Sequence, residues 1–175
     1  MKVRTQKGFT LIELLIVVAI IAIIAAIAVP NLMRARMTTN ESSAMGSLRA
    51  INSAEASYAA SAAPGGFSVD LAVLVRPCPG SSQGFISPDL GATRSVKSGY
   101  TVTITDGAGA ADVANDCNGV MSRSEYYSTA IPITLGSTGN RTFASTAGGS
   151  IFFSLTATPP TEAEMAPGGG GTPIQ

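Results

Sequence analysis

The sequence contains no histidine and no tryptophan, and only two of its 175 residues are cysteine. Without histidine the chain lacks the usual general base of a serine hydrolase, although Gly80-Ser81-Ser82-Gln83-Gly84 has the letters of a nucleophile elbow. Two cysteines without histidine also fall short of the four ligands of a structural zinc site. We therefore expect that the protein is not an enzyme and holds no cofactor.

Charge is also scarce, since only 13% of the residues are Asp, Glu, Lys or Arg. The 11 basic residues equal the 11 acidic ones, so the composition predicts no nucleic-acid partner. The charges are unevenly placed, because Lys2, Arg4 and Lys7 all precede the first acidic residue, Glu13. Residues 1–8 therefore form a short basic leader, which is expected to stay on the cytoplasmic side of a membrane.

A long hydrophobic run follows the leader. Residues 9–29 are apolar except for Thr10 and Glu13, and the run is unbroken from Leu14 to Val29. About 20 helical residues cross the hydrocarbon core of a bilayer, so residues 9–30 predict a transmembrane helix. Pro30 closes this segment and is expected to break or kink the helix, because proline cannot donate a backbone hydrogen bond.

Residues 31–63 predict the amphipathic half of the same helix. Apolar side chains recur there at steps of three, four or seven residues, while most charged side chains occupy the other faces. The recurring positions are Met33, Met37, Ala44, Leu48, Ile51, Ala54, Tyr58 and Ala62. Pro64-Gly65-Gly66 is expected to end the helix.

The remaining chain predicts a small β-rich head. Residues 64–157 contain four β-branched or aromatic runs, at 100–105, 126–133, 141–144 and 150–155, separated by turn residues. Three or four antiparallel strands packed on the amphipathic helix would form an α+β fold. Residues 77–97 are expected to be irregular, and the Pro/Gly-rich residues 158–175 to be disordered.

One motif in this plan is specific. The apolar helix opens with Lys7-Gly8-Phe9-Thr10-Leu11-Ile12-Glu13, and the whole motif covers about residues 7–32, including Pro30. It resembles the processing signature of type IV prepilins and type II secretion pseudopilins. The resemblance implies cleavage between Gly8 and Phe9, N-methylation of Phe9, a role for Glu13 in assembly, and a pilin-like fold.

The resemblance also implies partners and a location. The expected partners are a prepilin peptidase, an inner-membrane assembly platform, the lipid bilayer and further copies of the chain in a helical homopolymer. The subunit would first be held in the inner membrane by one span with its N-terminus in the cytoplasm. It would then enter a pilus or a periplasmic pseudopilus, and the sequence does not separate these two.

Glu13 supports the same hypothesis on physical grounds. A carboxylate within an apolar helix is costly to desolvate, and cleavage after Gly8 creates a cation at a similar depth, the amine of Phe9. Pairing between this amine and Glu13 of a neighbouring copy would fix the register of a polymer. Alternatively, Glu13 reaches toward the lipid surface, or the helix is a simple membrane anchor.

A conventional signal peptide is the main competing interpretation. A basic start, an apolar run and Ala26-Ile27-Ala28 as a small-x-small cleavage site fit such a signal. The product would be a periplasmic or secreted binding module beginning at Val29. Glu13 within the apolar run and Pro30 close behind the cut argue against it.

Two further sites are predicted for the exported head. Cys78 and Cys117 are expected to form a disulfide, which would contribute roughly 4 kcal/mol by constraining the unfolded chain. Asp106, Asp112 and Asp116 share one loop and are a weak calcium candidate, since calcium prefers clustered oxygen ligands. Their spacing is not that of an EF-hand.

Overall fold

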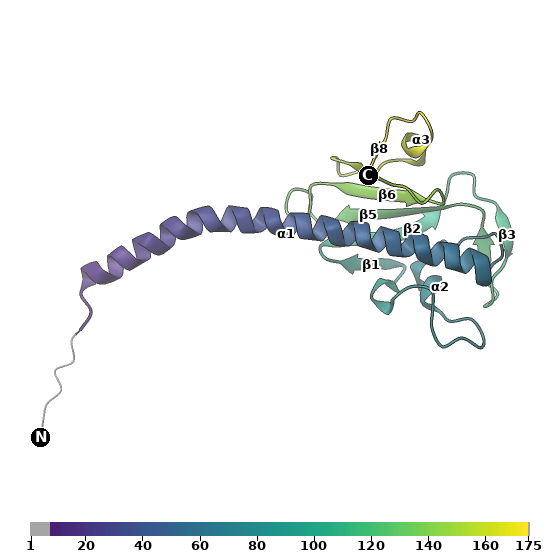
Figure 1. The fold of residues 1–175 in the computed structure, drawn as a ribbon, viewed down its shortest axis with the longest axis horizontal. Coiled ribbons are helices and arrows are strands. Elements are labelled where there is room, and N and C mark those ends of the chain that lie inside the picture. Colours follow the sequence, from purple (N-terminus) through teal and green to yellow (C-terminus); the bar gives the residue numbers. More distant parts are fainter. Residues whose placement is uncertain (1–7, 175) are drawn as a thin grey trace, which may run out of the picture. The chain divides into compact units, whose positions relative to one another are not determined.

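The computed structural model describes residues 8–174, so the predicted leader lies outside the described residues except for Gly8. The chain divides into two units, Met1–Arg36 and Met37–Gln175, which we describe separately (Figure 1). One helix, α1 (Leu11–Ser61), contributes to both. The other elements follow in the order α2 (Leu71–Val75), the 3-10 helix η1 (Pro88–Leu90), β1 (Arg94–Lys97), β2 (Tyr100–Asp106), β3 (Asp112–Asn115), β4 (Met121–Arg123), β5 (Tyr126–Pro132), β6 (Thr142–Thr146), β7 (Ile151–Ser154), α3 (Glu162–Met165) and β8 (Thr172–Pro173).

The first unit is the exposed, apolar part of α1. Large apolar side chains from Phe9 to Val29 are between 49% and 88% exposed. α1 is long and apolar enough to cross a membrane. Pro30 lies inside α1, which continues through it, so the helix does not end at this residue, and the predicted kink stays a prediction. Proline removes one hydrogen bond of the ladder, and the flanking bonds suffice to keep the chain helical.

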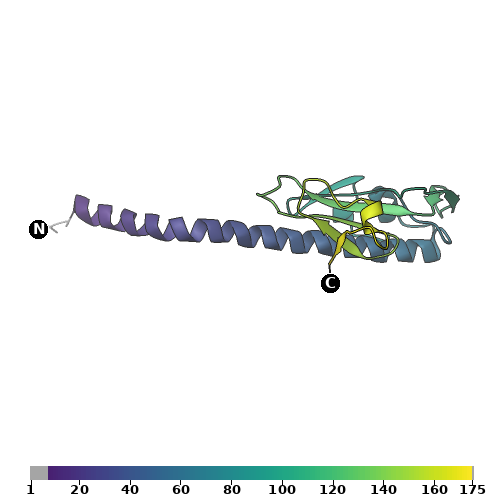
Figure 2. The same ribbon diagram turned by 90° about the horizontal axis from the view of Figure 1, so that it is seen from above.

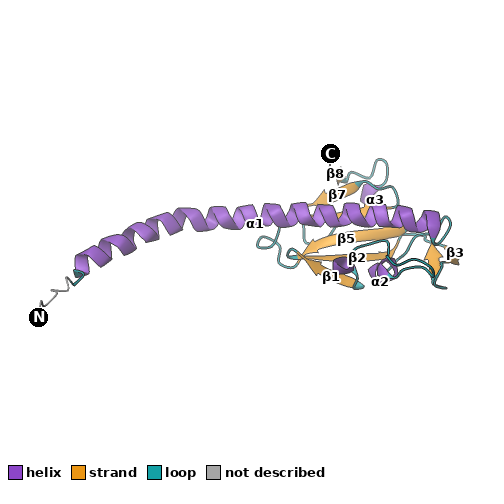
Figure 3. Cartoon of the chain, turned by 60° about the horizontal axis from the view of Figure 1, so that its bottom comes forward, coloured by secondary structure: helices purple, strands orange, loops and turns teal. Residues whose placement is uncertain are grey.

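The second unit is an antiparallel sheet covered on one face by the C-terminal part of α1 (Figure 2). The strand order is β1-β2-β5-β6-β7-β8, and β3 pairs with β4 in a separate ribbon. Figure 3 shows α1 running across the face of this sheet. The predicted α+β architecture is therefore confirmed, and the four predicted strands correspond to β2, β5, β6 and β7.

The core lies between α1 and the sheet. Tyr100, Val102 and Ile104 alternate with partly exposed threonines along β2 and point toward the helix. They meet the predicted stripe, of which Ala44, Leu48, Ile51, Ala54, Tyr58 and Ala62 are buried. Of the two remaining stripe positions, Met37 is half-buried and Met33 is exposed. The 3.6-residue period of the helix and the two-residue period of the strand thus produce matching apolar faces.

β1 was missed by the sequence prediction, which left residues 77–97 irregular. β1 and β2 are joined by Ser98 and Gly99, whose φ angles are 48° and 73°. Two successive residues in the left-handed region form the tight turn that matches the twist of a two-residue hairpin. The apolar side chain of this short strand, Val96, is 62% exposed. The sequence of β1 therefore lacks the alternation of apolar and polar residues that would have predicted a strand.

The C-terminal residues are ordered, which contradicts the predicted disordered tail over the described part of 158–175. Residues 156–171, here called the C-terminal strap, carry α3, and β8 follows and pairs with β7. Thr161 and Glu164 form a capping box at the start of α3. Met165 is buried, although Glu164 and Ala166 on either side of it are exposed. A sequence rich in proline and glycine is here fixed by specific contacts.

The strap covers the sheet face opposite α1. Phe143 points into the core beside Tyr100, so its neighbours Thr142 and Ala144 point the other way, and both are fully buried. Thr142 Oγ1 donates toward the carbonyl of Thr158 at 3.1 Å, and the Tyr127 hydroxyl donates to the carbonyl of Pro160 at 2.7 Å. β6 is consequently buried on both faces.

Candidate processing and assembly site

The functional candidates of the N-terminal segment meet at the first turn of α1. The Thr10 amide donates to Glu13 Oε2 at 2.8 Å and the Thr10 hydroxyl donates to the same oxygen at 2.6 Å. In return, the Glu13 amide donates to Thr10 Oγ1 at 3.3 Å. This reciprocal arrangement is a capping box, which satisfies amides that the first helical turn leaves without partners.

Thr10 is the functional residue that the sequence analysis overlooked. The signal was present, because a threonine three residues before a glutamate at the start of an apolar run is the pattern of a capping box. Glu13 therefore has a task within its own chain, in addition to the predicted task between chains. Both bonds from Thr10 reach Oε2, which holds the exposed carboxylate in one orientation and leaves Oε1 for another donor.

Gly8 and Phe9 lie immediately before this turn, and both are exposed. A Cβ added at Gly8 would meet no atom of the described chain within 4 Å. Nor does Gly8 have a positive φ angle that would favour glycine. The described chain therefore imposes no requirement for glycine at position 8.

The comparison with protein families matches this segment. Residues 3–29 match the prokaryotic N-terminal methylation motif, which is characteristic of type IV prepilins and pseudopilins. The match contains Gly8, Phe9, Thr10 and Glu13. No curated protein and no solved structure matches the chain. A methylation motif at the start of a long helix, with an α+β pilin-like head, supports a processed subunit of the pilin-like and pseudopilin-like class.

The helix of the head carries two buried carboxylates that the sequence analysis did not anticipate. Glu41, which was expected on an outer face, accepts from the Asn140 amide at 2.8 Å and pairs with Arg141 at 2.7 Å. The Arg141 guanidinium also lies over the rings of Phe143 and Phe153. The start of β6 is thereby attached to α1. A buried carboxylate with a well-placed guanidinium is tolerated because its desolvation is compensated.

Glu55 is the second buried carboxylate, with no exposed surface. Its Oε2 accepts from the Ser68 amide at 2.8 Å, whereas Oε1 has no hydrogen-bond partner among the described residues. Burial raises the pKa of Glu55 to about 8, an effect that the Ser68 bond partly offsets. The carboxyl is therefore largely protonated at neutral pH.

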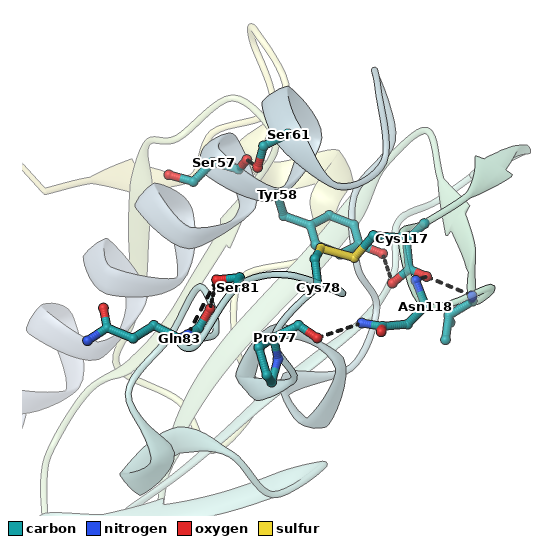
Figure 4. The surroundings of a disulfide bond; sticks show 11 residues. Ser57, Tyr58, Ser61, Pro77, Cys78, Ser81, Gln83, Cys117 and Asn118 are labelled. Carbon is teal, nitrogen blue, oxygen red and sulfur yellow. Dashed lines mark hydrogen bonds between the residues drawn. A yellow bond between two sulfur atoms is a disulfide. The ribbon is translucent and has the colours of Figure 1, made fainter.

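A disulfide joins Cys78 and Cys117, the pair expected from the sequence, with Cα atoms 5.5 Å apart (Figure 4). Beside it, the Tyr58 hydroxyl donates to Asp116 Oδ2 at 2.9 Å, and Asp116 Oδ1 accepts from the amides of Asn118 and Val120. The turn between β3 and β4 is thus attached to the loop after α2 by a covalent bond and to α1 by one buried hydrogen bond.

The weak calcium candidate is not supported by this geometry. Arg123 pairs with both Asp106 and Asp112, and Asp116 is buried and occupied by the bonds just described. Within residues 8–174, no group of three or more Asp, Glu, Cys or His side chains is placed to hold a metal ion. Closeness in sequence failed as a guide here because the three aspartates lie on β2, on β3 and in the β3–β4 turn.

Proposed function

We propose that the protein is a structural subunit of a type IV pilus or a type II secretion pseudopilus. In this proposal a prepilin peptidase cleaves between Gly8 and Phe9, the Phe9 amine is methylated, and copies polymerise through the N-terminal part of α1. The methylation motif over residues 3–29 is the observation that carries the proposal.

The exposed apolar surface of the first unit supports polymerisation. The large side chains from Phe9 to Val29 are exposed all around α1, which is not sustainable in water. A bilayer would cover this surface before assembly, and equivalent helices would cover it in a filament. An inner-membrane span with a cytoplasmic N-terminus follows from the basic leader.

The absence of any constraint within the described chain supports the cleavage site. Because position 8 has room for a side chain, a requirement for glycine would come from an enzyme that reads the leader. We expect a peptidase pocket that accepts a minimal side chain before the cut.

The orientation of Glu13 supports a role in register. Thr10 holds Oε2, and Oε1 remains available to the methylated amine of Phe9 on a neighbouring copy. Among helices packed together, this carboxylate would be desolvated, and the amine is a partner of opposite charge at the same depth. Pairing would then be possible only after the leader has been removed, so processing and assembly would be coupled.

The test separates the charge of Glu13 from its capping function. Glu13→Gln retains a capping box, because glutamine also serves at this position, but it removes the charge. Glu13→Val removes both, and Thr10→Ala removes the cap while retaining the charge. An uncompensated buried amine costs about 3–5 kcal/mol, which makes subunit addition hundreds to thousands of times less favourable. We expect Glu13→Gln and Glu13→Val to be cleaved yet nearly absent from sheared filaments, and Thr10→Ala to be present.

The readouts are immunoblots of sheared filaments against the membrane pool, together with the intact mass of the mature chain. Wild-type yields of Glu13→Gln in filaments would contradict the charge pair. A mature chain that begins at Val29 instead of a methylated Phe9 would contradict the proposed function as a whole and indicate a module released by signal peptidase.

A further inference from the structure

The face of the sheet opposite α1 is only partly covered. The strap lies over β5 and β6, whereas the outer side of β1, β2 and the end of β5 forms an open trough with a volume of about 480 Å³. Within it Val96 is 62% and Ile133 57% exposed. The trough is lined by Arg94, Val96, Thr101, Thr103, Ile131, Pro132 and Ile133.

One charged side chain, Arg94, lines this trough. Arg94 is exposed and takes part in none of the ion pairs found among residues 8–174, unlike Lys97, Arg123 and Arg141. The trough therefore offers an apolar floor with one cation at its edge. An occupant that fits it would present an apolar side chain beside a carboxylate.

The opposite side of the head carries an apolar side chain beside a carboxylate, Leu155 and Glu164. Leu155, which directly follows β7, is 69% exposed, and it lines a second hollow together with Glu164. Bonds from the Thr161 amide and hydroxyl lower the pKa of Glu164. β1 and β8 are at opposite ends of the strand order, and Figure 1 shows β1 at one side of the head and α3 with β8 at the other.

We propose that the trough at β1 receives Leu155 and Glu164 of a second copy of this chain. The two surfaces match in apolar character and in charge, and they lie on opposite sides of one head. A contact between unlike surfaces is heterologous, so each copy keeps one free surface of each kind and addition can continue without closing. This is the symmetry of a filament, and the inference rests on the proposed function.

Cysteine cross-linking tests the contact in the full-length chain. In a chain with both Val96→Cys and Leu155→Cys, oxidation of sheared filaments should produce a ladder of dimers, trimers and longer species on non-reducing gels. Each single variant should remain monomeric, because a heterologous contact does not bring like positions together. The two positions are at opposite sides of the head, so they cannot pair within one chain.

A charge reversal provides an independent readout. Arg94→Glu places a carboxylate opposite Glu164 and should lower the content of the variant in mixed filaments by about tenfold or more. Arg76→Glu, another exposed arginine without a role in the trough, is the matched control and should enter normally. Glu164→Lys in the Arg94→Glu background should restore incorporation.

The outcomes are distinguishable. Filaments that form normally without a ladder, or with Arg94→Glu incorporated as well as Arg76→Glu, would overturn the contact and leave the proposed function intact. Dimers from Val96→Cys alone would indicate an isologous contact or another occupant and would also overturn it. If the unaltered chain forms no filaments, both proposals fail.

Discussion

Glu55 shows how a single carboxyl can link the stability of the head to pH. The side chain is fully buried, one oxygen has no partner among the described residues, and Tyr58 and Tyr126 lie close to it. Folding raises its pKa from 4.5 to about 8. The folded state therefore holds a proton that the unfolded chain releases, and the resulting stability is complete below about pH 4.5 and is lost as the pH rises through 8.

We expect Glu55→Gln to stabilise the head at neutral and alkaline pH. Glutamine can still accept from the Ser68 amide, but it never ionises. The total dependence on pH corresponds to about 5 kcal/mol, of which about 3 kcal/mol is already lost at pH 7. In thermal unfolding of the full chain in detergent, the melting temperature of the wild type should fall from pH 5 to pH 9. The melting temperature of Glu55→Gln should change much less. The control is Glu125→Gln, which replaces an exposed carboxylate and should follow the wild type. If Glu55→Gln showed the same dependence on pH as the wild type, Glu55 would be ionised in the folded state.

At the scale of elements, the C-terminal strap is the part of the fold furthest from its sequence prediction. Its order depends on hydroxyl donors far away in the chain, Thr142 and Tyr127. Burial and the neighbouring Glu162 and Glu164 raise the pKa of Tyr127 to about 12, so its phenol remains a donor. Composition predicts disorder when apolar residues are few, and it contains no information about such distant partners.

We expect Tyr127→Phe combined with Thr142→Val to loosen the strap without unfolding the sheet. Each substitution removes a hydrogen bond of about 1 kcal/mol while keeping the shape of the side chain. Limited proteolysis should then cut the glycine run at residues 168–171 faster than in the wild type. Thr101→Val, on the same sheet face but away from the strap, should leave the rate unchanged. Equal rates in all three proteins would show that other contacts hold the strap.

Other elements were predictable to different degrees for physical reasons. β2 alternates buried and partly exposed residues, and the apolar stripe from Ala44 to Tyr58 repeats with the helical period. The strand and the buried face of the helix could therefore be predicted from the sequence. The burial of Glu41 and Glu55 could not be predicted, because a charged residue on a helix normally lies in solvent. Their partners, Arg141 and Ser68, are also separated from them in sequence. The N-terminal motif was recognised because its residues are contiguous, although the capping role of Thr10 was missed.

At the scale of the whole molecule, the head has a complete core of its own. Every residue of the buried cluster, from Ala44 onward, belongs to the unit Met37–Gln175, and so does the disulfide. We therefore expect this unit to fold without the apolar segment.

We expect a shortened chain of residues 37–175, exported by an unrelated signal, to be soluble without detergent and to unfold cooperatively. It should contain no free thiol and should form no filaments, because the first unit is absent. Circular dichroism during heating, thiol labelling and sedimentation are the measurements. A shortened chain that aggregates or unfolds without cooperativity would show that the head depends on the preceding helix.

The strap follows β5 and β6 in the chain, and this order has a consequence for biogenesis. A ribosome makes the chain from its N-terminus, and under the proposed function the head crosses the membrane in the same order. The strands β5 and β6 would then emerge with one face open, exposing Ala144 and the Thr142 hydroxyl until residues 156–174 arrive. Thus the segment that closes the sheet follows the strands that it covers, and a chain cut before residue 156 would leave β5 and β6 with one face open to solvent.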